Sequence, residues 1–306
     1  MSVKIEAPAS LLLGLARADT GPLAVSLTLR YPPVHLDARP AVQLEVEGAC
    51  APTAYAAAER VGRPAQIEIE LAIPTLMGLS GDPLLALSVA RALAELHDQP
   101  AQAPALAQAL GFTPDLAPEV WGFVQGGLLL CAVDAPLERP PLRRQRLQHA
   151  DAQAWVIVLY LPRPADDDPD NLEAERRAAL LAAAPHLSAP TAALVEQELW
   201  PAAERADFPA FARALQVLYD ANQEALAAAG TSLRHRPQAQ AMLELLRAEQ
   251  VPACGACLTG LGVWGLIQGA QPSIRLRQKM QALVGIAGGT VLGTITDNAG
   301  VQVHAV

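Results

Sequence analysis

Aromatic residues are scarce in this chain. They make up 4% of its 306 residues, whereas hydrophobic residues as a class make up 52%. The core is therefore expected to consist mainly of Ala, Leu and Val. The chain is long enough for two lobes, because single domains cluster near roughly 100–150 residues. We expect two domains that share one cleft, residues 1–150 and 151–306, since a new buried strand is predicted to begin at Trp155.

An excess of positive charge is also lacking. The formal net charge is −9, and the sequence pI is about 5.2. Proteins that bind nucleic acid or an anionic membrane surface usually carry a broad basic patch. We therefore expect neither partner, and an anionic ligand would have to be held by local groups.

Cysteines are few, and their spacing does not complete a metal site. Cys254 and Cys257 form one C-x-x-C pair, without a second pair or a histidine at the spacing of a zinc finger. A structural role for this pair is therefore favoured over metal binding.

Neither a secretory signal nor a membrane span is predicted. Residues 1–6 carry a charge of each sign, and the apolar run from Leu11 to Ala16 is too short for a signal. Residues 250–274 carry no charge, but they include glycines at five positions, whereas a spanning helix needs ~20 mostly apolar residues that favour a helix. We predict a buried loop and strand there, and a cytoplasmic protein.

The chain does contain a glycine-bearing loop that leads directly into an apolar helix. Residues 74–83 read Pro-Thr-Leu-Met-Gly-Leu-Ser-Gly-Asp-Pro, and residues 84–93 are almost entirely apolar. Asp82 is predicted as the N-cap and Pro83 as the first helical residue. The backbone N–H groups at such a helix start can hold an anion, although the same residues also suit an ordinary tight turn between a strand and a helix.

The remaining pattern predicts an α+β protein. Alternating or buried strands are expected within residues 3–46, at 66–71, within 120–133 after a turn, and at 155–161, with turns at 19–22 and 31–33. Helices are expected at 53–63, 101–111, 171–184, 191–206, 208–229, 238–249 and 273–284. A closing hairpin is expected to pair residues 290–296 with 301–305.

Several segments together resemble the β-ribofuranosylaminobenzene 5′-phosphate synthase family, a branch of the GHMP kinase superfamily that acts in tetrahydromethanopterin synthesis. The resemblance covers most of the chain. It depends on residues 7–15 (Ala-Pro-Ala-Ser-Leu-Leu-Leu-Gly-Leu), the loop and helix from Pro74, residues 126–130 (Gly-Gly-Leu-Leu-Leu), residues 199–211, and residues 260–265 (Gly-Leu-Gly-Val-Trp-Gly).

The resemblance implies a two-lobed GHMP-kinase-like fold and a homodimer. It also implies the joining of phosphoribosyl diphosphate to a 4-substituted benzoate, with loss of carbon dioxide and diphosphate. A diphosphate clamp, usually with Mg²⁺, would be required. The expected ligand-binding residues are Gly78, Leu79, Ser80, Gly81, Asp82, Gly126, Gly127, Gly260, Gly262 and Trp264, with Asp82 as the possible metal ligand.

The chain departs from the family pattern in two places, and these departures leave alternatives open. Residues 10–13 (Ser-Leu-Leu-Leu) replace a family Arg-Leu-His, and the loop is one residue shorter than the family's Gly-Leu-Gly-Ser-Gly, with Asp82 at its end. A carboxylate beside a phosphate is unfavourable unless a cation lies between them. The alternatives are a non-catalytic homologue that binds a ligand or a partner enzyme of the pathway, and a small-molecule kinase that uses ATP.

Other charged groups are expected to be solvated. The acidic run Asp166, Asp167, Asp168 and Asp170 could bind a metal but is more typical of a solvated loop. The basic cluster Arg143, Arg144 and Arg146 is expected in an exposed connector, and Asn222 is expected to face water.

Overall fold

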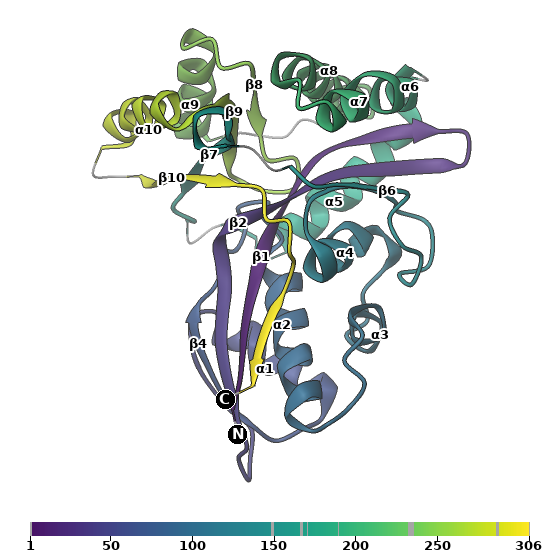
Figure 1. Ribbon diagram of the computed structural model, residues 1–306, viewed down its shortest axis with the longest axis vertical. Helices are drawn as coiled ribbons and strands as arrows, with labels where there is room; N and C mark the ends of the chain where they lie inside the picture. The colour runs from purple at the N-terminus through teal and green to yellow at the C-terminus, as the bar shows by residue number, and fades with distance from the viewer. Residues whose placement is uncertain are drawn as a thin grey trace.

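The computed structural model describes residues 2–147, 150–165, 168–169, 171–188, 190–231, 236–285 and 288–305. These residues form two β-sheets with helices packed around them (Figure 1). The seven-stranded sheet has the order β11-β1-β2-β4-β3, with β5 paired to β2 and β6 paired to β5; the four-stranded sheet has the order β10-β7-β9-β8. The predicted α+β class is confirmed.

The strands of the first sheet are β1 (Val3–Ala18), β2 (Gly21–Arg39), β3 (Glu45–Gly48), β4 (Gln66–Leu71), β5 (Leu128–Ala132), β6 (Arg143–Gln145) and β11 (Gln302–Ala305). Those of the second are β7 (Trp155–Pro162), β8 (Ala253–Ala256), β9 (Val263–Gln268) and β10 (Gly289–Ile295). The helices are α1 (Ala51–Val61), α2 (Gly81–Leu96), α3 (Ala103–Ala109), α4 (Ala117–Gln125), α5 (Leu172–Ala183), α6 (Pro190–Leu194), α7 (Trp200–Glu204), α8 (Phe208–Ala228), α9 (Pro237–Ala248) and α10 (Ala270–Val284).

Strands β1 and β2 form one long hairpin that organises the first sheet. The turn predicted at residues 31–33 is wrong, because β2 continues through it to Arg39. The pairing with β1 shifts from Ala9 opposite Leu29 to Ala7 opposite Val34, so residues 30–33 form a bulge. A bulge accommodates Pro32 and Pro33, which cannot donate to the ladder. Before the bulge β2 pairs with β5, and after it with β4.

Most of the predicted helices are confirmed to within about three residues at each end, but one N-cap differs and one helix was not predicted. Helix α2 begins at Gly81, and its N-cap is Ser80 rather than Asp82. Residues 117–125, of which the last six were expected in a turn, form α4, because Pro118 and Glu119 suit a first helical turn. Helix α8 is capped as expected, since the Asp207 carboxylate accepts a hydrogen bond of 3.1 Å from the Ala210 N–H.

The predicted closing hairpin is wrong. Strand β10 pairs with β7 in the second sheet, and β11 pairs with β1 in the first. Residues 297–300 carry the chain from one sheet to the other, as the yellow segment of Figure 1 shows. The last strand therefore belongs to the first sheet. The division into two domains at residue 150 stays a prediction.

Asn222 is buried rather than solvated. Its side chain is completely inaccessible and joins α8 to β1 by accepting from the Leu15 N–H and donating to the Leu15 carbonyl, both at 2.9 Å. A buried amide is retained because each of its polar groups has a partner. It follows that α8 is fixed in register on the hairpin.

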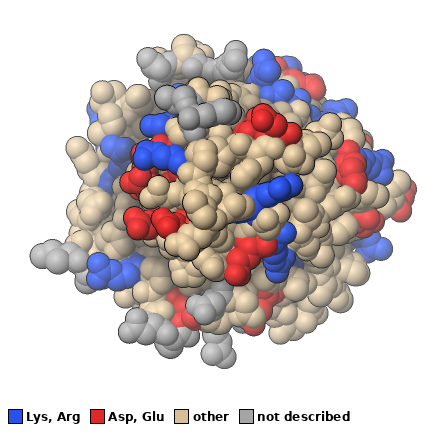
Figure 2. Space-filling view, turned by 90° about the horizontal axis from the view of Figure 1, so that it is seen from below, with Lys and Arg blue, Asp and Glu red and all other residues tan. Residues whose placement is uncertain are grey.

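The residues expected to form a buried loop and strand after Gln250 do so, as β8, residues 257–262 and β9. Among the described residues no single helix is long and apolar enough to cross a membrane. One bent pair of helices meets the requirement for a span by its length and composition only. Acidic and basic side chains are interspersed on the face shown in Figure 2, where neither sign dominates.

Candidate functional site

The glycine loop before α2 is tightly coiled. Leu76, Gly78 and Ser80 all have left-handed backbone conformations, with φ between 58° and 78°. At Gly78 a side chain would also collide, because its Cβ would lie 2.6 Å from the Cβ of Cys257. The loop is held on the hairpin by a 3.2 Å hydrogen bond from the Ser10 N–H to the Leu79 carbonyl. This geometry does not admit a larger residue at position 78.

The second glycine segment, residues 257–262, lies directly on this loop. The Leu261 N–H donates to the Leu76 carbonyl at 2.7 Å, and the Gly262 N–H donates to the Met77 carbonyl at 3.2 Å. A Cβ on Gly260 would be only 1.9 Å from the Gly78 nitrogen. The glycines expected to surround a ligand at residues 78 and 260–262 therefore make contact with each other.

The Gly78 N–H, which would be expected to hold phosphate, donates to a carboxylate of the protein. Its partner is Glu173 Oε1 at 2.7 Å, from the first turn of α5. Arg176, on the same helix, donates to the Gly260 carbonyl and ties α5 to the second glycine segment. The carboxylate of Glu173 therefore occupies the position of an anion at this donor.

The environment of Glu173 raises the pKa of its carboxyl group. Burial is the main cause and raises the pKa to about 7, with further repulsion from Asp82 and Glu119. The Gly78 N–H and Arg177 act in the opposite direction but do not offset the burial. Glu173 is thus close to half-protonated at neutral pH.

The Ser80 hydroxyl is also engaged inside the protein. It donates to Glu119 Oε1 at 2.8 Å, and the same oxygen accepts from Arg177 Nη2 at 2.5 Å. Ser80 and Glu119 are both buried, at 2% and 1% exposure. The charge of Glu119 is balanced by Arg177, as a buried carboxylate requires. Because it bonds to Glu119, the Ser80 hydroxyl makes no capping hydrogen bond at the start of α2.

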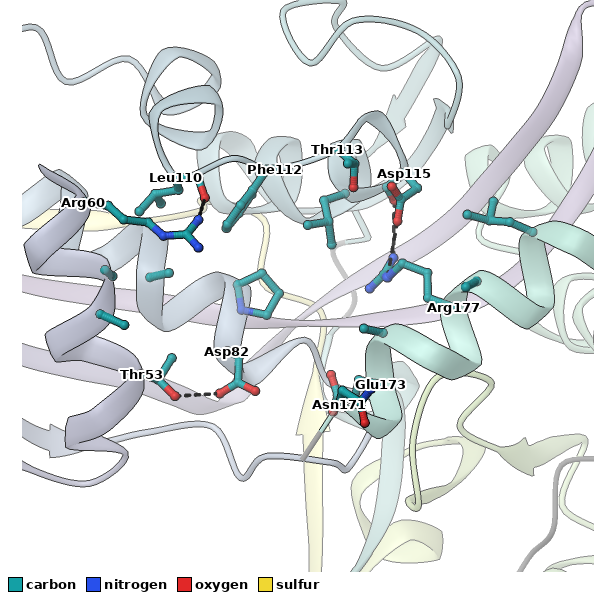
Figure 3. A pocket seen from close by; sticks show the side chains of 18 residues that line it. Thr53, Arg60, Asp82, Leu110, Phe112, Thr113, Asp115, Asn171, Glu173 and Arg177 are labelled. Carbon is teal, nitrogen blue, oxygen red and sulfur yellow. Dashed lines mark hydrogen bonds and ion pairs between the residues drawn. The ribbon is translucent and has the colours of Figure 1, made fainter. Parts of the chain in front are cut away.

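A cavity of about 730 Å³ lies beside the start of α2. Helices α1, α2 and α5 and residues 110–116 form its walls, which include Ala86, Phe112 and Leu181 (Figure 3). Three carboxylates border it, from Asp82, Asp115 and Glu173.

Charged groups that border the cavity already have partners within the protein. Asp82 accepts from the Thr53 hydroxyl at 3.2 Å. Arg60 donates to the Leu110 carbonyl, and the Arg177 Nε lies 3.9 Å from Asp115 Oδ2. Figure 3 shows these pairs across the walls of the cavity. Both bordering arginines therefore have acceptors within the protein.

Comparison with solved structures identifies the architecture. The homoserine kinase of Cytophaga hutchinsonii matches with a TM-score of 0.62 and 14% identity, over 99% of this chain and 97% of the other. Mevalonate diphosphate decarboxylase of Staphylococcus aureus matches with 0.64 and 14%, and mevalonate-3-kinase of Thermoplasma acidophilum with 0.61 and 12%; both matches cover 99% of this chain and 98% of the other. The fold is GHMP-kinase-like. No protein-family model matches the sequence, and no curated protein sequence matches it.

The other predicted site residues lie in packed positions of this GHMP-kinase-like fold. Gly126 and Gly127 follow α4 and contact the 297–300 turn, where the Gly127 N–H donates to the Asp297 carbonyl at 2.6 Å. Trp264 is completely buried and packs edge-on against Tyr219, with ring centroids 5.7 Å apart. Gly81 is buried in α2, where a Cβ would lie 2.8 Å from the Ile73 carbonyl oxygen.

Magnesium fits this site only together with a phosphate. Mg²⁺ is usually held by one or two carboxylates plus substrate phosphates, and Asp82 and Glu173 both border the cavity. In the part of the chain that the structure describes, no group of three or more His, Cys, Asp or Glu could hold a metal. Asp168 forms an ion pair with Arg236, whereas Asp166, Asp167 and Asp170 lie outside the described residues.

The prediction of a solvated connector at the basic cluster is wrong in part. Arg143–Gln145 forms β6, paired with β5, and Arg144 donates to the carbonyls of Gln125, Gly126 and Asn298. The bond to Asn298 joins segments 154 residues apart in the sequence.

Sequence reasoning did not identify Glu173, Glu119 or Arg177, which are central to the site. Glu173 lies in the sequence Leu-Glu-Ala-Glu-Arg-Arg, which is typical of a solvated first helical turn. Only the approach of the glycine loop, 95 residues earlier in the chain, gives this carboxylate its partner.

Proposed function

We propose that this chain is a non-catalytic homologue of the β-ribofuranosylaminobenzene 5′-phosphate synthase family, which binds a small ligand beside α2 in support of tetrahydromethanopterin synthesis. The hydrogen bond from the Gly78 N–H to the Glu173 carboxylate is the observation that carries this proposal. In this proposal the glycine loop stabilises the fold rather than binding the diphosphate of phosphoribosyl diphosphate.

The charges around the cavity argue in the same direction. A phosphate at the start of α2 would lie near Asp82 and Glu173, which both border the cavity there. Two like charges 4 Å apart repel by about 4 kcal/mol at the effective dielectric of a protein surface. Bound Mg²⁺ would reduce this repulsion, but the N–H of Gly78 would still have to exchange Glu173 for the ligand. Phosphoribosyl diphosphate and ATP are therefore disfavoured as ligands.

The cavity is better suited to an uncharged or cationic molecule with an apolar body. Its volume of about 730 Å³ lies in the range of small-molecule sites. Alanine, leucine and Phe112 side chains provide apolar walls, while Asp82 and Glu173 provide acceptors for ligand N–H or O–H groups. A nucleoside without phosphate has this combination of an aromatic body and several donors, so adenosine is a suitable probe.

The test is a thermal-shift series at mildly alkaline pH with three probes at millimolar concentration. Adenosine is expected to raise the melting temperature, because a ligand at 100-fold its Kd adds about 2.7 kcal/mol of stability. Phosphoribosyl diphosphate with Mg²⁺ and ATP with Mg²⁺ are expected to cause no shift. A shift with phosphoribosyl diphosphate would support the synthase instead, a shift with ATP would support a kinase, and no shift with adenosine would refute the ligand class.

A pair of variants on α5 locates the ligand. Ala178 borders the cavity, whereas Ala182 lies one turn further along the same helix and is exposed outside it. Ala178→Trp is expected to abolish the adenosine shift by filling the cavity, and Ala182→Trp is expected to preserve it. Equal shifts in both variants would place the ligand elsewhere.

A further inference from the structure

A second hollow region lies where the chain crosses from β10 to β11, and arginines border it. A hollow of about 680 Å³ is bordered by Arg30, Arg144 and Arg146, and an adjoining one of about 220 Å³ by Arg30 and Arg277. The two share Arg30 and Ile295. We call these two hollows and their four arginines the arginine groove.

Arg144 is built into the wall of the groove. Its guanidinium donates to the carbonyls of Gln125, Gly126 and Asn298, the last at 2.8 Å. Carbonyl oxygens carry no net charge, so the positive charge of Arg144 is not neutralised by these bonds. Burial is the main cause that lowers the pKa of Arg144, and repulsion from Arg146 adds to it. Both arginines border the larger hollow.

The segment opposite Arg144 is held rigidly. The Asn298 side chain accepts from the Leu147 N–H at 3.0 Å and donates to the Leu147 carbonyl at 2.9 Å. The carboxylate of Asp297 accepts from the N–H groups of Ala299 and Gly300, within its own turn. The acidic side chain of this turn is thereby engaged with backbone donors.

The other arginines of the groove have no acidic partner. Within the described ranges, Arg30, Arg146 and Arg277 form no side-chain hydrogen bond or ion pair, and no carboxylate lines either hollow. Gly293 leaves space for Arg277 to lie across β10, since a Cβ there would be 3.1 Å from Arg277 Cδ. By contrast, the cavity beside α2 is bordered by three carboxylates as well as two arginines.

We propose that the arginine groove binds a small molecule that carries at least two anionic groups, either phosphate or carboxylate. Guanidinium groups match both kinds of group through paired hydrogen bonds. Arg30 lies between the two hollows, with Arg144 and Arg146 on one side and Arg277 on the other, so two anionic groups can be held at once. The proposal does not depend on the ligand proposed for the cavity beside α2.

Calorimetric titration with sodium pyrophosphate, citrate and orthophosphate tests this proposal. Pyrophosphate or citrate is expected to bind at least tenfold more tightly than orthophosphate, and added salt is expected to weaken the binding. The stronger of the two identifies phosphate or carboxylate as the preferred group. No heat with either, or equal affinity for orthophosphate, would overturn the proposal.

Matched arginine variants locate the bound anion. Arg30 and Arg277 are exposed, so replacing them with glutamine leaves the core intact; Arg213 on α8 is an exposed arginine outside the groove. Arg30→Gln and Arg277→Gln are each expected to weaken binding about tenfold, the equivalent of about 1.4 kcal/mol, while Arg213→Gln leaves it unchanged. Equal effects of all three variants would refute a specific site. Loss of anion binding in Ala178→Trp would instead place the anion in the cavity beside α2.

Discussion

The substitution Glu173→Gln tests the contact between the glycine loop and Glu173 through its effect on the free energy of unfolding. Glutamine has the same shape, and its carbonyl oxygen can still accept from the Gly78 N–H, so the variant removes the charge and keeps the hydrogen bond. The carboxyl group of Glu173 has a pKa of about 7 in the folded protein, against 4.5 for an ordinary glutamate. Asp82, Glu119 and Arg177 are the charged groups that act on it.

The direction of the pH effect follows from this raised pKa. Between 4.5 and about 7 the folded protein retains a proton that the unfolded chain has lost. The contribution of Glu173 to stability is therefore complete below pH 4.5 and is lost as the pH rises through about 7. The full shift corresponds to about 3 kcal/mol, and we expect about 1 to 2 kcal/mol because Glu173 is only partly buried at the edge of a cavity.

Urea denaturation of the wild type and Glu173→Gln across this pH range measures the effect. Near pH 5 the two proteins are expected to be about equally stable, and near pH 8 the variant is expected to be more stable by about 1 to 2 kcal/mol. Other titrating groups are common to both proteins and cancel in the difference. Glu175→Gln, at an exposed position on the same helix, is the control and should not reproduce the gain in stability near pH 8. A difference that does not vary with pH, or one that favours the wild type near pH 8, would refute the reasoning.

Two further substitutions test the packing around the loop and the hairpin. Gly260→Ala is expected to separate the two glycine segments, because its Cβ would lie 1.9 Å from the Gly78 nitrogen. Thermal denaturation should show a far larger loss of stability than for Gly288→Ala, where the backbone is not left-handed and the nearest atom would lie 3.6 Å from the added Cβ. Asn222→Leu is expected to cost about 2 to 4 kcal/mol in urea denaturation, because it leaves the buried N–H and carbonyl of Leu15 without partners. Asp220→Ala, at an exposed position on the same helix, is its control, and an equal loss in both would argue against the buried amide contacts.

Local sequence signals predicted most of the elements. Asp207 and Gly230 bracket α8, and the alternation of residues 66–71 identified β4 with its observed bounds. Pairing between distant strands could not be predicted in the same way. Residues 290–305 contain two short strands and a turn, which is also the pattern of a hairpin, but each strand pairs with a different sheet.

The sequence predicted where the glycine loop lies, whereas the ligand-binding role of its residues stays a prediction. The glycine loop lies at the start of α2 as expected, and the second glycine segment lies on it. The sequence could not show that these segments pack against each other, because glycine favours close packing as well as ligand binding. The sequence also could not show the roles of Glu119 and Glu173. These carboxylates belong to the site only because Glu119 accepts from Ser80 and Glu173 accepts from Gly78, which lie far from them in the sequence.

The most direct measurement of the central claim is the amide proton of Gly78 in a protein labelled with ¹⁵N-glycine. If Glu173 accepts this N–H, the Gly78 resonance should titrate with an apparent pKa of about 7 in the wild type and should not titrate in Glu173→Gln. Phosphoribosyl diphosphate with Mg²⁺ should leave the resonance unchanged. A resonance that does not respond to pH, or one that shifts on addition of phosphoribosyl diphosphate, would contradict a loop closed by Glu173.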